Sequence, residues 1–105
     1  MANYLFVYHG GSKVTDPAEL ESVMQAWRDW FTAMGAAVID SGNPVGVSTT
    51  VNSDGSIVNH GGSNPASGYS LIAAADIDEA CARAKACPIL NSGGSIEIAE
   101  IIDMT

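Results

Sequence analysis

The sequence predicts an α+β fold, and three features of its 105 residues support this prediction. Two stretches show the apolar spacing and end signals of helices, and several short stretches rich in branched and aromatic residues are typical of strands. The strands do not simply alternate with the helices, and two helices provide too few crossovers for a parallel sheet. We therefore expect one domain, residues 1–105, with a ferredoxin-like split βαβ sheet, both helices on one face and an inserted β-hairpin. A small parallel α/β sheet is the alternative.

The first strand is expected at residues 4–8, "YLFVY", which are apolar on both faces. The first helix should begin at Pro17, with Asp16 as N-cap and Glu19 at the capping-box spacing. Gly35 is a typical helix stop. Between these signals the apolar residues form one stripe that predicts a buried helix face: Leu20, Val23, Met24, Trp27, Trp30, Phe31 and Met34.

The middle of the chain should form three further strands. Residues 36–41 are apolar and branched up to Asp40, and the turn residues Gly42, Asn43 and Pro44 follow them. Residues 47–51 and 56–59 flank an Asp-Gly pair, which predicts the inserted hairpin.

The last part repeats the strand–helix–strand order. A strand is expected at 69–75, and Asp76 should cap the second helix with Glu79 at the capping-box position. Pro88 should end this helix, and the last strand should run from 96 to 102. The inner face of the helix is expected to consist mainly of small residues: Ile77, Ala80, Cys81, Ala84 and Cys87.

Charge and composition restrict the class of partner. The net charge is −8, from four Lys plus Arg against twelve Asp plus Glu, which disfavours nucleic acids and anionic membranes as partners. Hydrophobic residues make up 47% of the chain and charged residues only 15%, below the usual share of about 25%. We therefore expect apolar surface to be covered by a partner.

The cysteines and the N-terminus predict a cytoplasmic setting. Cys81 and Cys87 form no CxxC pair, which fits a reducing compartment. The chain starts with a strand-like run without a basic region, unlike a signal peptide, and no apolar stretch reaches the roughly 20 residues of a membrane span.

Two helices cover only one face of the expected sheet, although the first strand is apolar on both. The free face should therefore be buried against a second copy in a dimeric α+β barrel. The interface is expected to include Tyr4 and Phe6, or their opposite-face neighbours Leu5 and Val7.

Five segments resemble the YCII-related family of small dimeric α+β barrel proteins: "YLFVYHGG", "AWRDWF", "DSGNPVG", "SGYSLIAAADIDEACARAKACP" and "GGSIEIAEI". The resemblance covers nearly the whole chain. It implies the ferredoxin-like fold, a homodimer and a cleft suggestive of an enzyme. Some members are thought to use a His–Asp pair with the histidine on the first helix. Here the histidines are His9 and His60, outside that helix, so the pair has no direct counterpart.

Asp40 and His9 are the candidate catalytic residues. Period-two alternation places Val38, Asp40 and Gly42 on one strand face, and Val38 suggests that this face points inward. We expect Asp40 to line a cleft near His9, as base or charge partner, with His9 carrying the proton. The structural alternatives are an Asp40 that bonds the following turn amides and a His9 that bonds backbone.

Four residues are candidate ligand contacts: Trp27, Asn43, Tyr69 and His60. Trp27 could instead belong wholly to the helix–sheet core. No metal or nucleotide motif is present, so we expect no cofactor.

These residues leave two hypotheses of function. The first is a homodimeric enzyme that acts on a small aromatic or cyclic molecule by metal-free proton transfer, of the isomerase, lyase or dehalogenase type. The second is a non-catalytic ligand-binding or assembly protein.

Overall fold

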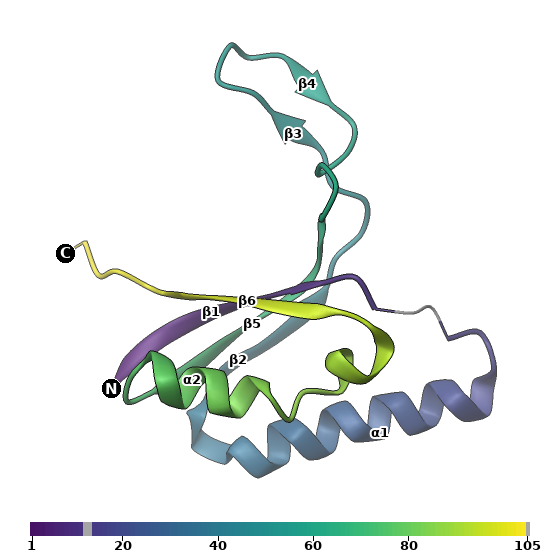
Figure 1. Ribbon diagram of the computed structural model, residues 1–105, viewed down its shortest axis with the longest axis vertical. Helices are drawn as coiled ribbons and strands as arrows, with labels where there is room; N and C mark the ends of the chain where they lie inside the picture. Colours follow the sequence, from purple (N-terminus) through teal and green to yellow (C-terminus); the bar gives the residue numbers. More distant parts are fainter. Residues whose placement is uncertain (12–13, 105) are drawn as a thin grey trace.

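The computed structural model describes residues 1–11 and 14–104 and shows an α+β fold (Figure 1). Four strands form an antiparallel sheet in the order β2-β5-β1-β6, which is compatible with a ferredoxin-like fold and excludes the parallel alternative. These strands are β1 (Ala2–His9), β2 (Val38–Pro44), β5 (Ala66–Ala74) and β6 (Ser95–Glu100). The remaining elements are α1 (Pro17–Met34), η1 (Gly35–Ala37), β3 (Thr50–Val51), β4 (Ile57–Val58), α2 (Ile77–Ala84) and η2 (Pro88–Ser92).

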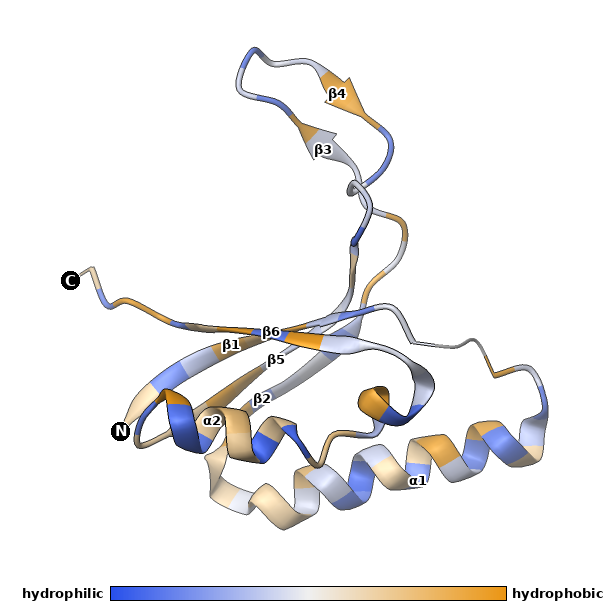
Figure 2. Ribbon diagram, viewed as in Figure 1, coloured by the Kyte–Doolittle hydropathy of each residue, from blue (hydrophilic) through white to orange (hydrophobic). Residues whose placement is uncertain are grey.

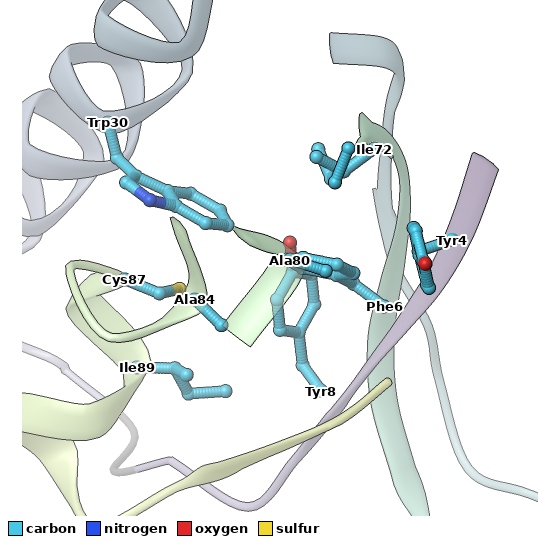
Figure 3. Packing of buried hydrophobic residues seen from close by; sticks show 10 residues of the cluster. Tyr4, Phe6, Tyr8, Trp30, Ile72, Ala80, Ala84, Cys87 and Ile89 are labelled. Carbon is cyan, nitrogen blue, oxygen red and sulfur yellow. The ribbon is translucent and has the colours of Figure 1, made fainter. Parts of the chain in front are cut away.

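Both helices lie on one face of the sheet, as expected (Figure 1). The side chains that β1 and β5 direct to this face pack with α1, α2 and η2 in one buried cluster (Figure 3). Phe6 and Ile72 are fully buried at its centre, and the Trp30 indole donates to the carbonyl of Arg83 at 3.0 Å. The cluster also contains Tyr4, Tyr8, Ala74, Ala80, Ala84, Cys87 and Ile89.

The two predicted N-caps behave differently. Asp76 accepts a hydrogen bond from Glu79 N–H at 2.9 Å, and the Glu79 carboxylate accepts from Ala75 N–H at 2.9 Å, so the cap of α2 is confirmed. Asp16 precedes α1 as predicted, but its side chain makes no capping hydrogen bond. The start of α1 therefore depends on Pro17 at N1 and on packing further along the helix.

The end of α2 differs from the prediction. The helix ends at Ala84, and Pro88 does not stop it but begins the short helix η2. Cys87 consequently lies beyond the helix and is buried, whereas Cys81 is exposed and not on the inner face. A proline at the first position of a helical turn loses no hydrogen bond. A proline after a helix is therefore compatible both with the end of that helix and with the start of a new one.

Strand β2 is irregular, which overturns the predicted alternation. Val38 lies opposite Ile72, Asp40 lies opposite Leu71 and Asn43 lies opposite Tyr69, with a register shift between each of these pairs. Ile72 belongs to the buried face and Leu71 to the opposite face of the sheet. Val38 and Asp40 are therefore on different faces, because the irregularity inserts an extra residue between them.

Residues 45–65, which we call the arm, contain the predicted hairpin and project away from the sheet (Figure 1). Their strands β3 and β4 are shorter than expected, with two residues each. Figure 2 shows that β4 is apolar although it lies far from the core. The radius of gyration is 15.1 Å, larger than the roughly 13 Å of a compact chain of this length.

No described helix is long and apolar enough to cross a membrane. Within residues 1–11 and 14–104, no group of three or more His, Cys, Asp and Glu side chains is arranged to hold a metal ion.

Candidate functional site

A cavity of about 610 Å³ opens between α1 and the sheet, and we call it the cleft. One wall comes from α1, through Val23, Met24, Trp27 and Phe31. The other walls come from segments of β1, β2 and β5, the glycines after β1, and η2. They are formed by Tyr8, Gly10, Gly11, Ser41, Gly42, Asn43, Pro44, Ser67, Gly68, Tyr69, Ile89 and Ser92.

The cleft exists because the apolar stripe of α1 is only partly buried. Trp30, in the second half of the helix, has 5% of its surface exposed, whereas Leu20 and Met24 in the first half are 46% and 48% exposed. The prediction of one continuous buried face is therefore wrong for the first half. Val23 and Met24 line the cleft there instead of packing in the buried cluster.

Aromatic rings form the inner part of the cleft. The Tyr8 and Trp27 rings meet edge to face, with centroids 5.0 Å apart and planes at 84°. The Trp27 and Phe31 rings lie 6.0 Å apart at 35°. Aromatic contacts at these separations are favourable, and they order the rings before any ligand arrives. Trp27 thus both packs on the buried cluster and lines the cleft.

The Tyr8 hydroxyl is held within the protein. It donates to Ser70 Oγ at 2.7 Å, and Ser70 Oγ donates to the carbonyl of Ser41 at 2.7 Å. Burial raises the pKa of Tyr8 far above its usual value, and the bond to Ser70 opposes this only in part. Tyr8 is therefore a neutral phenol at any physiological pH.

His9 is buried and lies next to, but outside, the residues that line the cleft. Its Nδ1 lies 3.2 Å from the carbonyl of Pro65, and its Nε2 lies 3.0 Å from a carboxylate oxygen of Glu97. His9 therefore ties the end of β1 to β6 and to the base of the arm. The contact with the Pro65 carbonyl is the backbone bond that was the structural alternative for His9, and the contact with Glu97 adds a side-chain partner.

Asp40 is exposed, and its carboxylate accepts from Gly42 N–H at 2.8 Å. Asp40 therefore bonds a following turn amide, which is the structural alternative to a catalytic role. In the sheet, Asp40 lies opposite Leu71, which lies opposite Leu5. His9 is four residues further along β1, or about 13 Å, and two strand spacings away. The structure does not bring Asp40 and His9 within hydrogen-bond reach.

The predicted ligand contacts divide into two groups. Trp27, Asn43 and Tyr69 come together as lining residues of the cleft. His60 lies in the arm, where its Nδ1 accepts from Gly62 N–H at 3.1 Å and its side chain is exposed. It is not part of the cleft.

Sequence reasoning missed Tyr8, Met24 and Phe31 as lining residues. All three belong to apolar patterns that predict a buried core, namely the "YLFVY" strand and the apolar stripe of α1. Only the way α1 lies across the sheet separates the buried residues of these patterns from those at the cleft.

The sequence matches no known family model, and a search of curated proteins finds no relative. The likeness to the YCII-related family is therefore a hypothesis, and the cleft is interpreted from its own geometry.

Proposed function

We propose that the protein binds a small, flat organic molecule in the cleft and does not catalyse proton transfer there. The observation that carries this proposal is the cavity of about 610 Å³ with Trp27 and Phe31 on its wall and Tyr8 behind them. Ligand sites are typically concave, largely apolar and within this size range. Phe6 and Ile72, at the centre of the buried cluster, do not line the cleft, so a ligand can fill it without displacing them.

The lining favours binding over the enzymatic hypothesis. Proton transfer near neutral pH needs a group that titrates there, within reach of the ligand. The two expected groups, Asp40 and His9, are engaged elsewhere by Gly42 and by Glu97 and Pro65. Among the described lining residues only Tyr8 and Tyr69 have ionisable side chains, and the Tyr8 phenol is locked neutral.

We also propose that the protein is a homodimer in which two open sheet faces meet to form an α+β barrel, as the YCII-related resemblance implies. Leu5, Val7 and Leu71 are apolar, lie on the face away from the helices and are partly exposed. Burying this face in a second copy would remove it from water. Light scattering at micromolar concentration should give twice the mass of the chain, and a monomer at all concentrations would contradict the dimer.

Thermal shift with a panel of small aromatic compounds tests the binding proposal. A compound at about 100 times its dissociation constant should stabilise the folded state by roughly 2.7 kcal/mol. Met24→Trp should abolish this shift, because the larger side chain fills the cleft from its wall. Leu20→Trp lies one turn earlier on α1, outside the lining, and should leave the shift unchanged. Equal shifts in both variants would place the ligand elsewhere and refute the proposal.

A further inference from the structure

The described lining of the cleft contains no charged side chain. Its polar side chains are serines, asparagine and tyrosine. The chain as a whole carries a net charge of −8, so its field also opposes the approach of an anion.

The remaining hydrogen-bonding capacity is concentrated on the strand side of the cleft. Ser41, Asn43 and Ser67 are among its lining residues, and their side chains make no hydrogen bond to another described residue. Tyr8, by contrast, commits its hydroxyl hydrogen to Ser70. A ligand therefore meets apolar surface on the α1 side and these polar residues on the strand side.

We infer that the ligand is an uncharged aromatic molecule. Its ring lies against Trp27, and its hydroxyl or carbonyl group forms hydrogen bonds at the part of the cleft lined by Ser41, Asn43 and Ser67. This inference rests on the proposed binding function and narrows the class of ligand. An ionised group that enters such a lining loses hydration without gaining an opposite charge, which is far costlier than burying a hydroxyl that finds a partner.

An aromatic wall can also attract a cation, but the rings here are poorly placed for it. A cation is best held over ring faces. The Tyr8 ring is buried in the cluster and meets both Trp27, at 84°, and Trp30, at 70°, in edge-to-face contacts. Trp27 and Phe31 come from one helix, one turn apart, so they form a single wall and do not surround a charge.

Three ligands with the same rings separate these possibilities: naphthylmethanol, naphthoate and naphthylmethylammonium. Calorimetric titration at neutral pH should give the alcohol an affinity at least about tenfold higher than either ion, since desolvation of the charge is uncompensated. An ion that binds as tightly as the alcohol would overturn the inference and leave the proposed binding function standing. Binding of none of the three would also overturn it. The thermal-shift panel reports separately on the proposed function.

A variant pair tests whether the uncharged lining sets this preference. Met24→Lys places an ammonium at the cleft, and it should raise the affinity for naphthoate by about tenfold relative to the alcohol, because the carboxylate then has a partner. Leu20→Lys adds the same charge to the same helix outside the cleft and should leave the ratio unchanged. The inference fails if both variants change the ratio equally or if neither does.

Discussion

Asp40 and Gly42 are a single residue pair that shapes the site through the backbone of β2. Gly42 has a φ of +73°, and a Cβ atom there would collide with the carbonyl of Tyr69 on the neighbouring strand. Only glycine fits both conditions. The carboxylate of Asp40 holds the Gly42 N–H, and so fixes the irregular part of β2 that lines the cleft.

Gly42→Ala should therefore lower the free energy of unfolding by more than about 2 kcal/mol, from the strained φ together with the backbone collision. Gly46→Ala is the matched control, because a Cβ atom there meets nothing within 4 Å. It should change stability by less than about 0.5 kcal/mol. Urea denaturation measures both, and similar midpoints for the two variants would contradict the close contact between β2 and β5.

The two cysteines differ in their surroundings. Burial raises the pKa of the Cys87 thiol to about 11, whereas Cys81 is exposed on α2. Thiolate is the reactive form, and because the pKa of Cys87 is raised, its thiolate forms only as the pH approaches that value.

Iodoacetamide at pH near 8 should thus modify Cys81 alone in the folded protein and both cysteines in denaturant. Mass spectrometry of the digested protein measures the two sites separately. Modification of Cys87 at the rate of Cys81 under native conditions would show that the buried cluster around it opens readily.

At the scale of elements, α1 and α2 are held in place by different means. Helix α2 has eight residues and a complete cap from Asp76 and Glu79. The bond from Ala75 N–H and the nearby Arg83 lower the pKa of Glu79. Because the pKa of Glu79 is lower in the folded state, its ionised carboxylate stabilises the fold. This stabilisation is fully present above the ordinary pKa of glutamate and is lost as the pH falls through the lowered pKa. Helix α1 has 18 residues and depends on Trp27, Trp30 and Phe31.

Asp76→Ala should accordingly lower the free energy of unfolding by about 1 kcal/mol, the usual value of an N-cap. Asp16→Ala should cost less than half as much, because its side chain makes no capping bond. Thermal or urea denaturation of the two variants measures the difference. Equal losses would show that Asp16 also caps its helix in solution.

At the scale of the whole molecule, the arm is the least compact part. Val47 is 94% exposed, and Val51 and Ile57 are also largely exposed. A two-stranded hairpin is marginally stable by itself in water. The arm projects from the side of the sheet that the helices do not cover (Figure 1). We therefore propose that the second copy contacts both this open sheet face and the apolar residues of the arm.

Replacing both Val47 and Ile57 by Asp should therefore raise the dissociation constant of the proposed dimer by tenfold or more, since each apolar side chain buried in an interface contributes about 1.5–3 kcal/mol. Ser53→Asp combined with Asn59→Asp adds the same charge at exposed polar positions of the arm. Analytical ultracentrifugation over a range of concentrations measures both variants. If the two pairs weaken the dimer equally, charge and not apolar contact is responsible.

The sequence by itself determined the α+β class, the number of helices and most of their ends. Those signals are local: Pro17 sits at N1, Asp76 and Glu79 form a cap, and Asp54-Gly55 makes the turn of the arm. Each works through atoms only a few residues away, so a short window of sequence contains the whole interaction.

Only the tertiary structure decided the site. Which face Asp40 occupies depends on the register of β2 against β5, and a one-residue insertion reverses it. Whether Trp27 is wholly buried in the core or also lines the cleft depends on how α1 lies across the sheet. Trp30, one turn later on the same helix, is buried. Both outcomes follow from contacts between segments that are distant in the sequence, and the pattern of apolar residues is the same for either result.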